Sequence, residues 1–275
     1  MTYQTSNHNR NRFIGITEAG DAGNDLSWYH TLRTDERYLG AVLVTKSGEK
    51  EAFQEKALKL LNYKPLIVHF GCTGWGGTAM EPGCTDPDTL IASIRTFIDN
   101  GFPASNIVFR TNPIIPTDEG LKRAEYVLRQ ANNILPDVKR RRLSIYDDYH
   151  SAREEMQKRG YEAIDSVTKW KNEMERRPTR AQIETVADMI LSLHDDLTYE
   201  LCAEPELGEF MPEKFHWCGC ISEIDCALMG IEVPENMPRN GQKRFGCQCL
   251  QFKKELLSHK CRCCNNCAYC YWGRS

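Results

Sequence analysis

Short apolar runs alternate with longer amphipathic stretches over residues 13–204, and this alternation limits the fold more than any other feature of the sequence. Each run is compact, as in AVLVTK and LIVHF, which predicts a strand. The predicted strands cover residues 12–17, 40–46, 65–70, 106–110, 142–147 and 197–202. Strands that alternate with helices form a mostly parallel sheet, so we expect an α/β protein.

The stretches between these strands have the spacing of amphipathic helices, which we predict near residues 50–62, 87–99, 117–134, 148–159 and 180–194. The clearest is the segment 118–135, where apolar residues recur at steps of three and four: Leu121, Ala124, Val127, Leu128, Ala131 and Leu135. Such spacing gives a helix one apolar face. Thr117 stands where it can cap the first turn, and Asp118 and Glu119 suit the positive end of the helix dipole.

About six βα units fall short of the eight units of a full barrel. We therefore predict a partial (βα) TIM-type barrel over residues 1–204, with an open doubly wound sheet as the alternative. Residues 205–275 are predicted to form a small cysteine-rich lobe. This lobe would contain a short helix near 221–230, a late seventh strand at 254–259 and a terminal cysteine loop.

The charge balance and the hydropathy pattern restrict the function classes. Lys and Arg number 35 against 38 Asp and Glu, and the net charge of −3 argues against a protein that coats nucleic acid by bulk electrostatics. The sequence has no run of 18 apolar residues, and its first residues lack the apolar core of a signal peptide. We expect a cytoplasmic protein with no membrane partner.

Cysteine is unusually frequent and unevenly placed. Thirteen of the 275 residues are cysteines, and ten of them lie in the last 58 residues. A chain that is not exported and gathers its cysteines at one end favours a metal site over a disulfide framework.

The final cysteines include a C-x3-C-x2-C motif made by Cys263, Cys267 and Cys270, with Tyr269 directly before the last thiol. Three thiolates on a tight loop can hold three irons of a 4Fe-4S cluster and leave the fourth iron open to a small molecule. The motif therefore predicts a cluster with one open coordination position.

Other cysteines offer alternative metal sites. A rival set with C-x2-C spacing throughout would close a four-thiolate cluster or a zinc site: Cys261, Cys264, Cys267 and Cys270. Five further cysteines are candidates for an auxiliary Fe–S cluster or zinc: Cys218, Cys220, Cys226, Cys247 and Cys249. The alternative for these five is that some are ordinary small buried residues.

The cysteine triplet with its tyrosine resembles the cluster loop of the radical SAM superfamily, whose fold is a partial or full (βα) barrel. Its place at the end of the chain is similar to that in an uncharacterised bacterial and phage family, labelled DNA repair photolyase-like by analogy to spore photoproduct lyase. Seven segments carry the resemblance: ITEAGDAG (16–23), VLVTK (42–46), RTNPIIPT (110–117), LSIYDDY (143–149), CAE (202–204), KRFGCQC (243–249) and CAYCYW (267–272). Members usually have one cysteine opening the triplet, whereas Cys261, Cys263 and Cys264 all stand there in this chain.

The resemblance implies a radical SAM enzyme. A reduced 4Fe-4S cluster on the triplet would bind S-adenosylmethionine and cleave it to methionine and a 5′-deoxyadenosyl radical, which abstracts a substrate hydrogen. It implies a reductant such as flavodoxin or ferredoxin, and lyase, isomerase or repair-type DNA modification of a thymine-type base; a small metabolite or a peptide is equally admissible. The alternative is a non-catalytic zinc or Fe–S module that binds nucleic acid or a protein partner.

The loop after the third predicted strand is a candidate cofactor-binding segment. Gly76, Gly77 and Thr78 resemble the superfamily's GGE segment, which contacts the amino group of S-adenosylmethionine, although threonine replaces the acid. A tight glycine turn is the competing interpretation. Tyr269, beside the cluster thiols, is a further candidate for contact with the cofactor.

Residues at other predicted strand ends supply the remaining candidates. Glu18 and Asp21 follow the first strand and are expected to bind substrate or ribose, or else to cap the loop. Arg110 ends the fourth strand and is a natural carboxylate anchor. A structural ion pair of Arg110 with Asp147 or Glu204 is the competing interpretation. Cys72, after the third strand, is either a hydrogen-atom donor or a packing residue.

Overall fold

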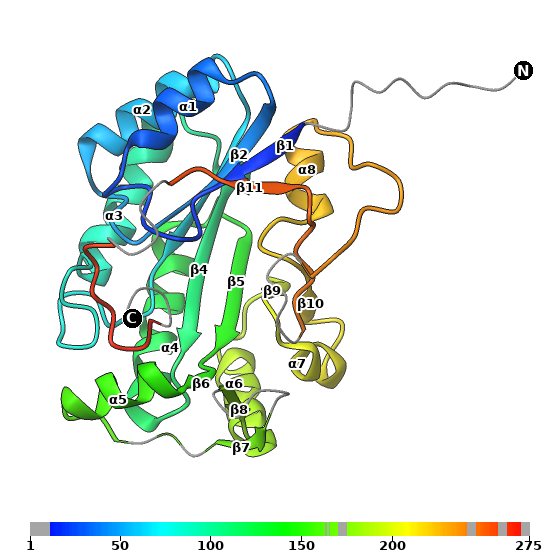
Figure 1. The fold of residues 1–275 in the computed structure, drawn as a ribbon. Helices are drawn as coiled ribbons and strands as arrows, with labels where there is room; N and C mark the ends of the chain where they lie inside the picture. Colours follow the sequence, from blue (N-terminus) through cyan, green and yellow to red (C-terminus); the bar gives the residue numbers. More distant parts are fainter. Residues whose placement is uncertain are drawn as a thin grey trace, which may run out of the picture.

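The computed structural model describes residues 12–162, 164, 166–169, 175–240, 246–257 and 263–270 (Figure 1). In this part of the chain, eight strands form one parallel sheet: β1 (Phe13–Ile16), β2 (Tyr38–Thr45), β3 (Leu66–Gly71), β4 (Ile107–Ile114), β5 (Arg140–Ile145), β9 (Tyr199–Leu201), β10 (Phe215–Trp217) and β11 (Lys253–Glu255). A second, antiparallel sheet has the order β6-β8-β7 and consists of β6 (Asp148–Tyr149), β7 (Ser166–Lys169) and β8 (Glu175–Pro178).

The helices follow the strands in alternation. They are α1 (Ser27–Thr34), α2 (Glu51–Leu61), α3 (Pro87–Asp99), α4 (Asp118–Ile134), α5 (His150–Lys158), α6 (Arg180–Leu191), α7 (Pro205–Phe210) and α8 (Glu223–Leu228), with a 3-10 turn, η2 (Ala104–Asn106), before β4. Every helix of the described residues is too short or too polar to span a bilayer.

The large sheet has the strand order β10-β9-β5-β4-β3-β2-β1-β11. From β1 to β10 neighbours in the sheet follow the order of the chain, and β11 returns to pair with β1 through Ile14 and Lys253. The predicted α/β class with a parallel sheet is confirmed. The sheet has eight strands instead of about six with a late seventh, because β10 is only three residues long and gave no periodic signal.

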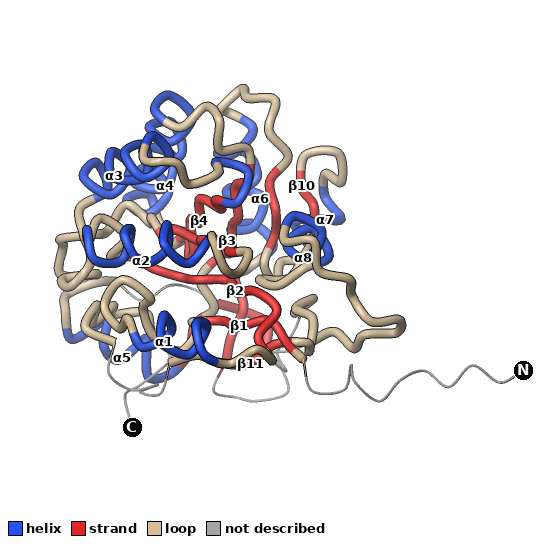
Figure 2. The backbone as a smooth tube through the Cα atoms, turned by 90° about the horizontal axis from the view of Figure 1, so that it is seen from above, coloured by secondary structure: helices blue, strands red, loops and turns tan. Residues whose placement is uncertain are grey.

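Helices cover one face of this sheet and the C-terminal segment covers the other. Because side chains alternate along a strand, β3 directs Leu66 and Phe70 to one side and Ile67 to the opposite side. The first side packs against helices α1 to α4 and α6 in the larger core. Figure 2 shows α1 to α4 on one side of strands β1 to β4. Ile67 belongs to a smaller core with Cys226 of α8 and Leu250.

Local capping explains why the predicted helices begin where they do. The side chain of Asp86 accepts a hydrogen bond from the Thr89 amide at the start of α3. Thr117 does the same for the Gly120 amide at the start of α4, as predicted. These side chains satisfy amides that have no partner within the first helical turn. Both helices match their predicted ranges to within a residue.

Residues after 204 complete the same large sheet as residues before 204. Strands β10 and β11 form its two edges, and α8 packs on its inner face. The predicted short helix near 221–230 corresponds to α8, and the predicted late strand corresponds to β11, which ends at Glu255. The last residues of that predicted strand, beyond 257, lie outside the described residues.

Candidate functional site

A cavity of about 220 Å³ lies at the carboxyl ends of the parallel strands. Its wall includes residues that lie within or after four of these strands: Glu18 after β1, Lys46 after β2, Arg110 within β4 and Tyr146 after β5. Seven cysteines complete the lining: Cys202, Cys220, Cys247, Cys249, Cys263, Cys267 and Cys270. Parallel α/β folds bind their ligands at this edge, so the cavity is the candidate functional site.

The segment 263–270, here called the cysteine loop, is attached on one side to the loops after β1 and β2. The Asn265 amide donates to Asp21 Oδ2 at 2.6 Å, and its oxygen accepts from Asn24 Nδ2 at 2.8 Å and Ser47 Oγ at 3.2 Å. Asp21 also accepts from Thr45 Oγ1 at 2.7 Å and from the backbone amides of residues 23 and 46. Asp21 therefore orders three loops around one carboxylate.

On its other side, the cysteine loop packs against the segment that follows β3. The Ala268 amide donates to the Met80 carbonyl at 2.8 Å, and the Cys84 and Cys267 sulfurs lie 3.8 Å apart. Gly83 packs backbone to backbone, since a Cβ there would lie 2.2 Å from the Cys264 carbonyl oxygen. The cysteine loop, red in Figure 1, is thus held on both sides by packed residues of the sheet loops.

Tyr269 is held by a buried polar cluster. Its hydroxyl bonds to Lys46 and Glu81, which pair with each other at 2.6 Å, and Thr73 Oγ1 donates to Glu81 at 2.6 Å. Burial opposes the charge of Lys46, but the Glu81 carboxylate beside it raises the pKa of Lys46 above its ordinary value. Burial, with Glu81 next to it, raises the pKa of Tyr269, so the phenol remains protonated.

We expect Asp21→Asn to lower the free energy of unfolding by about 2 kcal/mol. The asparagine NH2 group would replace one carboxylate oxygen, and it cannot accept the hydrogen bonds that this oxygen accepts in the unchanged protein. Equilibrium urea denaturation of the two proteins measures the difference. Asp25→Asn is the matched control, since Asp25 accepts a single exposed bond from the Ser27 amide and asparagine can accept it equally. An equal loss in both variants would contradict the anchoring role of Asp21.

The three thiols of the C-x3-C-x2-C motif all line the cavity, whereas Cys264, in the same loop, is not part of the lining. The Cys263 side chain is exposed, that of Cys267 is buried and that of Cys270 is half-buried. Cys261 of the rival set lies outside the described residues.

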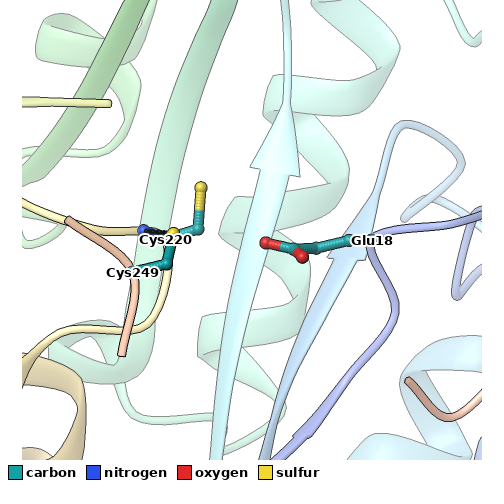
Figure 3. Close-up of side chains that lie close together, drawn as sticks. All are labelled: Glu18, Cys220 and Cys249. Atoms are coloured by element: carbon teal, nitrogen blue, oxygen red, sulfur yellow. Dashed lines mark hydrogen bonds between the residues drawn. The ribbon is translucent and has the colours of Figure 1, made fainter. Parts of the chain in front are cut away.

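Four other cysteines, here called the four-cysteine group, pack together on the same cavity: Cys202, Cys220, Cys247 and Cys249. The sulfurs of Cys202 and Cys220 lie 3.1 Å apart, and the Cys220 amide donates to Cys249 Sγ at 3.1 Å. A carboxylate oxygen of Glu18 and the sulfurs of Cys220 and Cys249 lie within 4.8 Å of one another (Figure 3). This arrangement is a potential metal-binding group.

The sequence of this region matches one known family. Residues 28–272 fit the family described as "Domain of unknown function (DUF1848)". The chain is a member of the DUF1848 family. The match covers strands β2 to β11 and both sets of cysteines that line the cavity. A search of curated proteins gives no match.

In this DUF1848 protein, the five candidate auxiliary cysteines separate into two kinds. Cys220, Cys247 and Cys249 belong to the four-cysteine group, but Cys226 packs in the smaller apolar core, and Cys218 Sγ lies 3.8 Å from Glu200. The fourth member, Cys202, was absent from the predicted set. Its position as the last residue of the predicted strand 197–202, in the CAE segment, was the available signal.

The predicted cofactor-binding glycines lie away from the cavity lining. Gly77 adopts a φ of 76°, and its amide donates to the Glu81 carbonyl at 3.1 Å. Thr78 Oγ1 donates to the Trp75 carbonyl at 2.6 Å, and a Cβ on Gly76 would lie 1.9 Å from the Thr85 carbonyl oxygen. The segment is a tight turn whose effect on the site is to place Glu81 against Tyr269.

The remaining predicted residues have different surroundings. Glu18 lines the cavity, and its carboxylate accepts from Lys253 Nζ at 2.6 Å, while its backbone amide donates to Glu255 Oε2 at 3.1 Å. Burial, together with Cys220, raises the pKa of Glu18 to about 7, although Lys253 opposes the shift. Cys72 is buried in the larger core on the helix side, and burial raises its pKa to about 12.

Arg110 lines the cavity, and its guanidinium lies 3.9 Å from Cys202 Sγ. The competing interpretation of Arg110 as an ion-pair partner was wrong, because Arg177 takes both expected acids: Glu204 at 3.0 Å and Asp147 at 3.8 Å. Arg110 Nε and Nη2 also donate to the side-chain oxygen of Asn112, at 3.2 and 2.8 Å, next to the cavity.

A buried network of ion pairs lies on the face of the sheet that packs against α8. Glu200 pairs with Arg140 at 2.6 Å and with Arg142, and Asp225 of α8 pairs with Arg140 at 2.8 Å. Arg142 also donates to the Cys220 carbonyl at 3.0 Å and contacts His69. Burial, with Arg142 and Arg110 nearby, lowers the pKa of His69, so the ring is neutral. The network attaches the Cys220 segment to strands β5 and β9.

Proposed function

We propose that this DUF1848 protein is a radical SAM enzyme whose 4Fe-4S cluster is held by Cys263, Cys267 and Cys270. One observation carries the proposal: these three thiols line one cavity at the carboxyl edge of the sheet, while Cys264 of the rival set is not in that lining. Three thiolates that converge on a space suit a cluster with one open iron. A closed four-thiolate site on the rival set would need Cys264 to reach the same space.

The strand order favours a partial (βα) barrel as the framework for this chemistry. In a barrel the first and last strands are neighbours, and here β11 pairs in parallel with β1. The order also increases steadily from β1 to β10, without the internal reversal of a doubly wound sheet. We infer that the sheet is such a barrel, left open between its edge strands β10 and β11.

When bound, the cluster and S-adenosylmethionine would supply a 5′-deoxyadenosyl radical that removes a hydrogen atom from the substrate. The residues of the chain position these groups. Asp21 and Asn265 fix the base of the cysteine loop, and Tyr269 is held by Lys46 and Glu81. Such fixed positioning would keep the reacting atoms in line.

Some lining residues also support a proposal for the class of substrate. Tyr146 and Tyr149 offer aromatic surfaces that suit a planar heterocycle, and Arg110 offers a planar fork for a carboxylate or phosphate. A thymine-type nucleotide in DNA has both a planar heterocycle and a phosphate. A base in a duplex must be flipped out to enter the site. A small metabolite or peptide with an anionic group is the competing substrate, and flavodoxin or ferredoxin is the proposed reductant.

An anaerobic assay tests the function. The protein is reconstituted with iron and sulfide, reduced with dithionite and mixed with S-adenosylmethionine; 5′-deoxyadenosine is then measured together with the electron paramagnetic resonance spectrum of the cluster. We expect 5′-deoxyadenosine and a spectrum altered by S-adenosylmethionine. A cluster spectrum that S-adenosylmethionine leaves unchanged would contradict the proposal and favour a non-catalytic metal-binding module. Zinc bound to the triplet would do the same.

A further inference from the structure

The four-cysteine group lies on the same cavity as the cysteine loop but is made by separate parts of the chain. Cys202 follows β9, Cys220 follows β10, and Cys247 and Cys249 precede β11. All four side chains are buried, and the sulfurs of Cys202 and Cys220 approach to 3.1 Å. The Cys220 and Cys249 sulfurs, with a Glu18 oxygen, lie within 4.8 Å of one another. Neighbouring thiols from three segments are the donors that thiophilic metals prefer.

The backbone around the group is shaped to bring these sulfurs together. A Cβ on Gly219 would lie 2.5 Å from the Cys249 Cα, so only glycine lets the two C-x-C segments pack against each other. Gly246 has a φ of 64°, and a Cβ there would lie 2.9 Å from the Ala203 carbonyl oxygen. Ala203 itself has a φ of 66°, a left-handed conformation that costs energy for a residue with a Cβ.

The charges around the group suit thiolates. Four thiolates on a divalent ion leave an excess of negative charge, and two cations lie beside the sulfurs: Arg110, 3.9 Å from Cys202, and Lys253, which pairs with Glu18. In the described part of the chain, Arg110 has no salt bridge to a carboxylate. The Cys220 amide, which donates to Cys249 Sγ, supplies the N–H···S bond that stabilises a coordinated thiolate.

We propose that Cys202, Cys220, Cys247 and Cys249 bind a second metal centre, a zinc ion or an iron–sulfur cluster, through four thiolates. With four protein ligands the coordination is closed, so the centre joins three segments of the chain and forms one wall of the cavity. The thiols release their protons to solvent when a zinc ion or a preassembled cluster binds, and the bound metal keeps its oxidation state. This site does not depend on radical SAM chemistry at the cysteine loop.

The test uses the full chain in which Cys263, Cys267 and Cys270 are all replaced by alanine, so that metal on the cysteine loop does not contribute. The protein is purified without oxygen, and zinc, iron and sulfide per chain are measured by elemental and sulfide analysis. We expect either one zinc per chain or iron and sulfide in cluster proportions. Adding Cys220→Ala should lower the metal content at least about tenfold, while adding the matched control Cys226→Ala should leave it unchanged.

X-ray absorption at the zinc or iron edge of the same triple variant tests the ligands without removing any of them. Four sulfur neighbours per zinc, or thiolate-ligated iron, would support the proposal even if the Cys220→Ala protein fails to fold. A folded triple variant with only trace metal would overturn the proposal. So would metal retained after Cys202→Ala and Cys249→Ala, or a Cys202–Cys220 disulfide in the freshly isolated protein. Failure of 5′-deoxyadenosine formation in the unchanged protein would overturn only the proposed function.

Discussion

Cys267→Ala is expected to abolish 5′-deoxyadenosine formation and the broad visible absorption of the cysteine-loop cluster. Cys267 is the middle thiol of the motif, lines the cavity and lies against the segment after β3 through Cys84. Without it only two thiolates of the triplet remain, too few to hold three irons. The variant is reconstituted anaerobically, and its absorption and 5′-deoxyadenosine yield are compared with those of the unchanged protein. Absorption from metal on the four-cysteine group is measured separately in the triple-alanine variant.

Cys264→Ala is the matched control, because Cys264 belongs to the same loop but not to the cavity lining. We expect this variant and Cys261→Ala to keep the cluster and the cleavage activity. Loss of the cluster in either control would favour the four-cysteine rival set with C-x2-C spacing. Cleavage retained in Cys267→Ala would refute the assignment of the triplet.

Glu200→Ala is expected to lower the free energy of unfolding by about 3–5 kcal/mol, because it leaves two buried arginines to share Asp225. Arg140 and Arg142 both pair with Glu200, and Arg142 is fully buried. Urea denaturation measures the effect. Glu55→Ala is the control, since Glu55 and Lys59 form an exposed pair at 3.3 Å, and its loss should cost less than about 1 kcal/mol. Equal effects would show that the buried network does not stabilise the fold.

The same carboxylate makes stability depend on pH in a defined direction. Burial opposes the charge of Glu200, but Arg142 and Arg140 lower its pKa from 4.5 to about 2. Its contribution of about 3 kcal/mol is therefore complete above pH 4.5 and is lost as the pH falls toward 2. We expect the stability difference between the unchanged protein and Glu200→Ala to shrink when urea denaturation is repeated at about pH 3. A difference that stays constant with pH would contradict the shift.

Local signals explain which parts of the fold could be predicted from the sequence. Helices α3 and α4 were predicted almost to the residue because a capping side chain and an apolar face lie within each segment. Strand β10 and the antiparallel strands β6 to β8 were missed because they do not lie in an apolar run of the sequence. Strands β9 and β11 are equally short but lie in or beside such a run, and both were predicted.

In the candidate site, too, the residues with a local sequence signal were predicted and the others were missed. The cysteine triplet has its own spacing, and Glu18, Asp21 and Arg110 were found because strand ends meet at one edge of a parallel sheet. Cys202 and Asn265 were missed because their partners are distant in the chain. The direction of Cys72 was predictable: two residues beyond Phe70, the strand period places it on the helix face, away from the cavity.

The attachment of the cysteine loop determines the order in which the protein can mature. Asp21 precedes Asn265 by 244 residues, and Cys84 precedes Cys267 by 183. At about 5–20 residues per second, a ribosome needs roughly ten to forty seconds to make the stretch between the latter two. These two partners of the loop thus emerge long before its thiols. A metal that requires the thiols in their final positions is therefore bound only after the loop itself has been made.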